Sequence, residues 1–128
     1  MATKATDVGA PYTPGAVNLA NAQTGNGVST DILDRGARTA PMGIQIVTTV
    51  GATPTATFAL EGSMDGTSWF AVPYTDPATP DTSSISTIVI TTATTTRRFI
   101  RGGFPYRFFR VNVTSNTNVT FTIDVFVY

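Results

Sequence analysis

The chain of 128 residues contains no cysteine and no histidine. It therefore has no disulfide, no thiol nucleophile, no Ser-His or Cys-His catalytic pair and few of the usual zinc ligands. Glutamate and lysine occur once each, as Glu61 and Lys4, and leucine is scarce. Because these residue types favour helices, their scarcity argues against helical structure. We therefore expect a protein that is not an enzyme and that uses no cofactor or metal.

The chain also lacks an excess of positive or negative charge. Eight acidic and eight basic residues give a formal net charge of zero, so long-range attraction to nucleic acid or to an anionic membrane is not indicated. No apolar run approaches the roughly 18 residues of a membrane helix. Residues 1–7 lack the apolar core of a signal peptide. The expectation is no membrane partner and no nucleic-acid partner.

Threonine, in contrast, supplies 25 of the 128 residues, and its branched Cβ suits the pleated surface of a strand. From Pro41 onward apolar and polar residues alternate, with turn signals between the alternating segments. The pattern predicts strands at 43–50 and 107–114, a turn at 51–54 and a long loop at 73–84. Seven or eight short strands of this kind predict an antiparallel β-sandwich, jelly-roll-like, over residues 41–128. The clearest apolar face belongs to the last strand: Val119, Phe121, Ile123, Val125 and Val127.

Residues 1–40 have a different composition. They are rich in glycine, proline, alanine and asparagine, and Tyr12 is their only aromatic residue. A segment of this kind cannot build a core alone, so it predicts an extended N-terminal arm with two short strands, at 16–20 and 28–33. The arm either lies across a neighbouring subunit or is a flexible tail, and both interpretations stay open. Deleting residues 1–38 should then leave a folded sandwich that no longer binds its partner.

Residues 58–70 read Phe-Ala-Leu-Glu-Gly-Ser-Met-Asp-Gly-Thr-Ser-Trp-Phe and predict a β-hairpin. Asp65 is expected to cap its own backbone and Gly66 to adopt a positive φ, which favours a turn over a calcium site. Trp69 is expected in the core, because burying an indole removes a large apolar area from water.

Five of the eight basic residues fall within residues 97–110, where aromatic residues interleave with them. This mixture is typical of protein–protein interfaces. A solvated strand face is the second interpretation, and a site for single-stranded nucleic acid is a distant third. A smaller cluster of acidic and basic residues lies within residues 31–38. The candidate interface residues are Tyr12, Asp31, Asp34, Arg35, Arg38, Arg97, Arg98, Arg101, Arg107 and Arg110.

Three segments in succession resemble small β-sandwich virion proteins of tailed bacteriophages, including capsid cement or decoration proteins. They are Ile44-Gln-Ile46 before a glycine turn, the pattern E-G-S-x-D-G-x-x-W at 61–69, and Arg-Phe-Phe-Arg-Val-Asn-Val-Thr at 107–114 before a final strand. The resemblance covers residues 42–128 and leaves out the predicted arm.

The resemblance implies a structural virion protein. Such a protein would be made in the host bacterial cytoplasm and would stabilise the lattice of the major capsid protein at the capsid surface, as a homo-oligomer with a trimer favoured. The alternative is a carbohydrate- or receptor-binding sandwich of a phage tail or spike, with Trp69 and Tyr74 as an aromatic platform. A cellular binding module unrelated to phage is the third possibility.

Overall fold

The computed structural model describes residues 2–5, 15–36, 40–103 and 106–127. Within these residues the chain forms one eleven-stranded sheet and no helix, and none of them forms a helix long and apolar enough to cross a membrane. All strand pairs are antiparallel except β1 with β4. The strands are β1 (Ala2–Ala5), β2 (Gly15–Gln23), β3 (Gly27–Val28), β4 (Asp31–Asp34), β5 (Met42–Ser63), β6 (Phe70–Ala71), β7 (Tyr74–Thr75), β8 (Ser83–Ser84), β9 (Ile88–Ile90), β10 (Thr95–Ile100) and β11 (Phe108–Val127).

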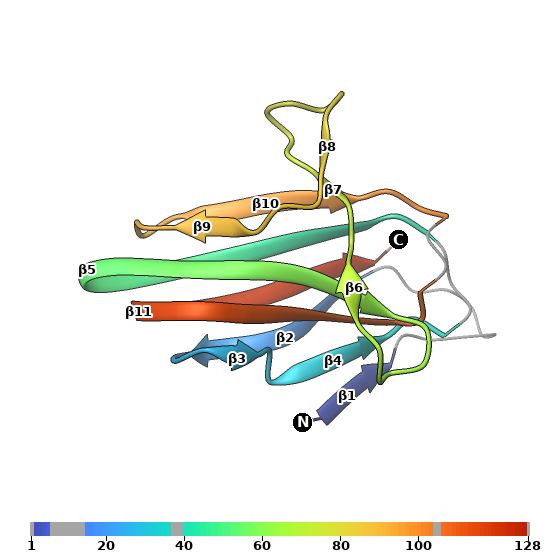
Figure 1. Cartoon of the computed structure of the whole chain (residues 1–128), viewed down its shortest axis with the longest axis horizontal. Helices are drawn as coiled ribbons and strands as arrows, with labels where there is room; N and C mark the ends of the chain where they lie inside the picture. The colour runs from blue at the N-terminus through green and yellow to red at the C-terminus, as the bar shows by residue number, and fades with distance from the viewer. Residues whose placement is uncertain (1, 6–14, 37–39, 104–105, 128) are drawn as a thin grey trace.

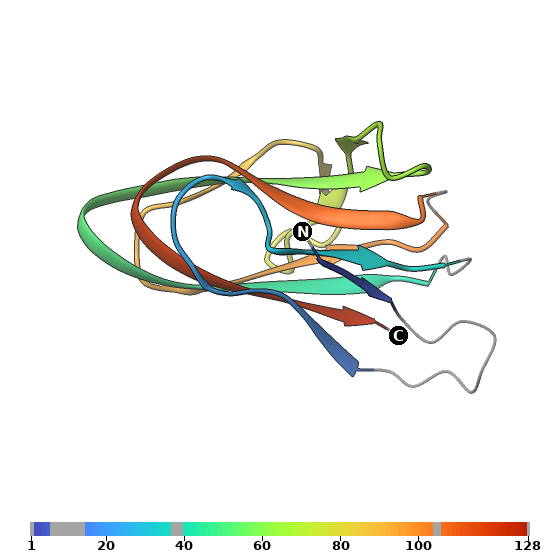
Figure 2. The same ribbon diagram turned by 90° about the horizontal axis from the view of Figure 1, so that it is seen from below.

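The two longest strands, β5 and β11, form a ribbon that runs through the whole sheet (Figure 1). They pair over almost their entire lengths, with register shifts between residues 113 and 119 of β11. Thr53 on β5 and Asn118 on β11 have positive φ angles of 44° and 55°. Such irregularities bend a paired ribbon, and Figure 2 shows the ribbon turned back on itself so that two layers face each other.

Strand pairing assigns the remaining strands to these layers. The first half of β5 and the second half of β11 pair with β10 and β2. The second half of β5 and the first half of β11 pair with β3, β4, β6 and β9. Phe58 from one half of the ribbon and Phe121 from the other meet edge to face, with ring centroids 5.2 Å apart. The core therefore lies inside the bend.

Alternation along β11 matches the prediction for the last strand. The five apolar residues from Val119 to Val127 are buried, and the residues that alternate between them are less buried. The strands expected at 43–50 and 107–114 are likewise parts of β5 and β11. The all-β prediction is confirmed over the described residues, whereas the jelly-roll connectivity is not.

The extended N-terminal arm is not confirmed either. Residues 15–36 belong to the sheet, because β2, β3 and β4 all pair with β11. Leu19 and Leu33 are completely buried in the core. The sequence pattern does not predict that residues 15–36 join the core, because this segment has few apolar residues among many small and polar ones. A deletion of residues 1–38 would remove these three strands, so a folded remainder no longer follows.

Candidate functional site

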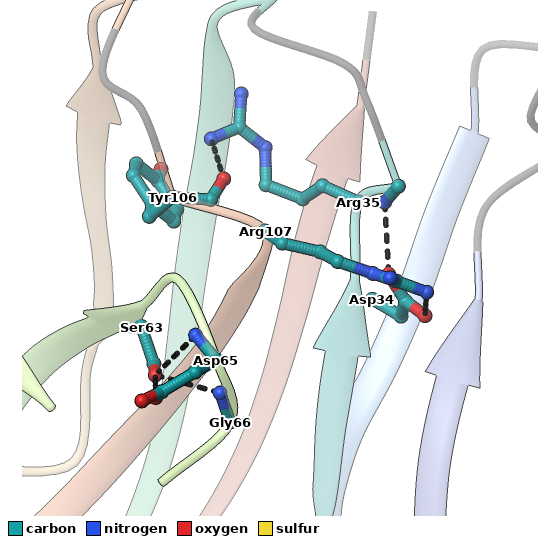
Figure 3. Close-up of polar contacts among 8 residues, drawn as sticks. Asp34, Arg35, Ser63, Asp65, Gly66, Tyr106 and Arg107 are labelled. Carbon is teal, nitrogen blue, oxygen red and sulfur yellow. Dashed lines mark hydrogen bonds and ion pairs between the residues drawn. The ribbon is translucent and has the colours of Figure 1, made fainter. Parts of the chain in front are cut away.

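The turn after β5 is built by side-chain caps (Figure 3). Ser63 Oγ accepts hydrogen bonds from the backbone N–H groups of Asp65 and Gly66, at 3.3 and 2.9 Å. Asp65 Oδ1 accepts from Thr67 N–H and Ser68 N–H, at 2.8 and 2.9 Å. These donors hold the pKa of Asp65 below its usual value, and Gly66 has a φ of 80°. The predicted hairpin and its turn are confirmed, since β6 pairs with β5.

Trp69 lies outside the core, so the prediction that it fills the core is wrong. It is partly exposed, and the guanidinium of Arg110 lies 4.0 Å from the centroid of its ring. Arg110 Nε also donates to Glu61 Oε1 at 2.8 Å. Since Glu61 and Arg110 are cross-strand neighbours on β5 and β11, the indole covers an ion pair on the sheet surface instead of filling the interior.

Two candidate interface residues pair with each other. Arg107 Nε and Nη2 donate to the two carboxylate oxygens of Asp34 at 2.9 and 3.0 Å (Figure 3). This two-bond geometry suits a guanidinium and a carboxylate. The hydrogen bonds from Arg107 lower the pKa of Asp34, aided by a bond from Gly36 N–H. The pair joins the residue that precedes β11 to the end of β4.

Arg35 lies in the interior, with 2% of its surface exposed. Its guanidinium donates to the carbonyl oxygens of Ala40 at 2.9 Å and Tyr106 at 3.4 Å, and it lies 4.2 Å from the centroid of the Tyr106 ring. Burial lowers the pKa of Arg35 and raises that of Tyr106 to about 12. Arg35 therefore connects the chain after β4 to Tyr106, and its buried charge is not accessible to a partner.

Arg98 is also held within the chain. Its Nη2 atom lies 3.6 Å from a carboxylate oxygen of Asp76, and its Nη1 donates to the Arg97 carbonyl at 2.7 Å. Its Nε is buried without a hydrogen-bond partner among the described residues. Of the five arginines within 97–110, three thus pair with a carboxylate of the same chain.

The other two arginines of this group, Arg97 and Arg101, are exposed and lie on either side of Phe99 in the sequence. Arg97 Nε donates to Gln45 Oε1 at 3.0 Å, and Arg101 Nη2 donates to the Pro80 carbonyl at 3.5 Å. The Phe99 side chain is 47% exposed and borders a groove of about 400 Å³. The sequence pattern indicates these arginines and the interleaved aromatic residues. It does not predict the groove, because the walls of the groove come from separate segments of the chain.

Three candidate interface residues remain. Asp31 is partly exposed on β4, while Tyr12 and Arg38 lie outside the described residues. No group of three or more acidic side chains that could hold a metal ion occurs in the described ranges.

Comparisons with known proteins add one finding. No protein-family model and no curated protein sequence matches the chain. Its fold is similar to the crystal structure of YomS, a protein derived from the SPBc2 prophage, with a TM-score of 0.63 over 91% of this chain and 94% of YomS. Sequence identity is 11%, so the likeness concerns the fold.

Proposed function

We propose that the protein is a structural component of a phage virion, and specifically a capsid cement or decoration protein that binds the major capsid protein. The observation that carries the proposal is the fold shared with a prophage-derived protein over nearly the full length of both chains. The turn pattern at 61–69, which resembles that of small virion proteins, supports it independently.

The internal ion pairs suit a structural role. The Glu61–Arg110 pair joins β5 to β11, and the Asp34–Arg107 pair joins β4 to the residue that precedes β11. Both pairs stiffen the sheet without leaving those charges for a partner. A rigid unit loses little conformational freedom on docking. Many copies on one lattice would then raise the overall affinity through avidity, even where each contact is modest. A homotrimer would provide three such contacts at a lattice symmetry axis.

The test is direct. Particles of the phage or prophage that carries the gene are separated into head and tail fractions, and the protein is located by mass spectrometry. Purified protein is then added to particles from a deletion strain and sedimented. Saturable binding to heads, with slower particle rupture on heating, is the expected result. Absence from all particle fractions would overturn the proposal.

The alternative is a receptor- or carbohydrate-binding protein of the tail or spike. The partly exposed position of Trp69 favours this alternative, whereas Tyr74, the second residue of the expected aromatic platform, is buried. Recovery in tail fractions, together with sugar binding that Trp69→Ala abolishes in a folded protein, would select it.

A further inference from the structure

An apolar residue lies between two cations at the end of β10. Arg97 and Phe99 are outward-facing residues of β10, Arg101 directly follows its last residue, and all three are exposed. Alternate residues of a strand point to the same face and lie about 7 Å apart. We call these three residues and the adjoining groove the β10 surface.

The groove beside Phe99 is open and mostly apolar. Pro41, Phe99, Ile100 and Arg101 line it together with Pro80, which belongs to the segment between β7 and β8 that rises beside β10 (Figure 1). Phe99 also lies over Gly43: a Cβ there would stand 3.8 Å from the ring, at an ordinary van der Waals distance. An exposed aromatic ring at a groove of this size is a common feature of binding surfaces.

The charges of the β10 surface are available to a partner. Arg97 and Arg101 donate to the uncharged oxygens of Gln45 and Pro80, and among the described residues no ion pair joins either arginine to a carboxylate. Two acidic groups near this surface are engaged elsewhere, Asp76 with Arg98 and Asp124 with Asn18. Asp81, which follows Pro80, is exposed, and no ion pair joins it to either arginine among the described residues.

We infer that the β10 surface docks an extended acidic segment of a partner protein. One apolar side chain of the segment enters the groove beside Phe99, and carboxylates two residues before and after it pair with Arg97 and Arg101. The two-residue spacing of an extended segment matches that of Arg97 and Phe99 on the strand, and Arg101 lines the groove beside Phe99. Arginine pairs carboxylates through two bonds. A second copy docked through the same surface would bring the four arginines together and is disfavoured. The inference rests on the proposed function only for the identity of the partner.

The test uses synthetic seven-residue peptides with aspartate at positions two and six and each apolar residue in turn at position four, and amide NMR spectra of the ¹⁵N-labelled protein. The best peptides should shift amides of β10 and of Met42 and Gly43. A matching set with lysine in place of aspartate should bind at least tenfold more weakly. If no acidic peptide shifts these amides, or if the lysine set binds equally well, the inference is overturned.

Two variants locate the contacts. Phe99→Ala should weaken binding of the best peptide at least tenfold, while the matched control Val89→Ala, at a 60% exposed apolar residue of β9, should leave it unchanged. Arg97→Glu combined with Arg101→Glu should reverse the preference, so that the lysine peptides bind better than the aspartate ones. Unaltered preference in the folded double variant would contradict the proposed pairing.

Sedimentation with particles distinguishes this inference from the proposed function. Loss of particle binding by both variants of the β10 surface supports the two together. Particle binding that survives both variants leaves the virion role standing and overturns the β10 surface as its contact. Peptide binding without any particle association supports the β10 surface and overturns the virion role.

Discussion

At the scale of single residues, Gly62 shows how tightly the end of β5 is packed. A Cβ at this position would lie 2.8 Å from Val72 Cγ2 and 3.0 Å from the Tyr106 ring. Both neighbours are buried, so neither can move aside freely. The glycine in the turn pattern is therefore required by space, whereas Gly66 is required by its positive φ.

We predict that Gly62→Ala lowers the free energy of unfolding by about 1–3 kcal/mol through overpacking. The matched control is Gly43→Ala, because a Cβ there would have its nearest neighbours at 3.8 Å and alanine is no worse in a strand than glycine. Urea unfolding of both variants gives the comparison. Equal stability of the two would contradict the close packing at Gly62.

Tyr106 allows a prediction for alkaline pH. Its hydroxyl is buried without a hydrogen-bond partner among the described residues, and burial raises its pKa from 10.0 to about 12. Between these two values the folded state keeps a proton that the unfolded state loses, so stability falls as the pH rises. The contribution of the protonated Tyr106 hydroxyl to the free energy of unfolding is complete below pH 10 and is lost as the pH rises through about 12.

Tyr106→Phe should remove this part of the pH dependence. We expect the variant to equal or exceed the wild type at pH 7, because an unpaired buried hydroxyl is lost. At pH 11 it should be more stable by about 1 kcal/mol. Urea unfolding at pH 7, 10 and 11 measures the difference, and parallel pH profiles would show that the phenol is not shielded as described.

At the scale of elements, β2 is part of the fold and not an appendage. It pairs with the last half of β11 and places Leu19, fully buried, in the core. Leu19→Ala should therefore cost about 2–4 kcal/mol of unfolding free energy. Ile85→Ala is the control, since that side chain is 66% exposed and should change stability by less than about 0.5 kcal/mol. Similar losses of unfolding free energy in the two variants would indicate that residues 15–23 form an arm outside the core.

Strands were predictable where alternation was strong, as in 43–50 and 119–127, which are parts of the longer strands β5 and β11. They were not predictable where the chain bends without ending a strand. The turn expected at 51–54 is a bend inside β5, because β11 bends with it and keeps the pairing on both sides. Similarly, the expected loop at 73–84 contains the short paired strands β7 and β8.

At the scale of the whole molecule, the β5–β11 ribbon belongs to both layers, so neither layer is a separate unit (Figure 2). We therefore predict a single cooperative unfolding transition. Trp69 fluorescence reports on one layer and far-ultraviolet circular dichroism on all strands, and their urea transitions should coincide. Separate midpoints would indicate that the layers unfold independently.

The sequence by itself determined the all-β character, the capped turn at 63–68 and the buried face of the last strand, because each depends on residues close together in the chain. Only the tertiary structure decided which charged side chains pair with each other. Asp34 and Arg107 are 73 positions apart, and they pair because β4 lies beside the start of β11. Trp69 lies on the sheet surface because its ring packs against Arg110, which pairs with Glu61 on the neighbouring strand. Missing helix formers and alternating residues specify strands, but the bend of the ribbon brings distant strands together and leaves Arg97, Phe99 and Arg101 facing outward.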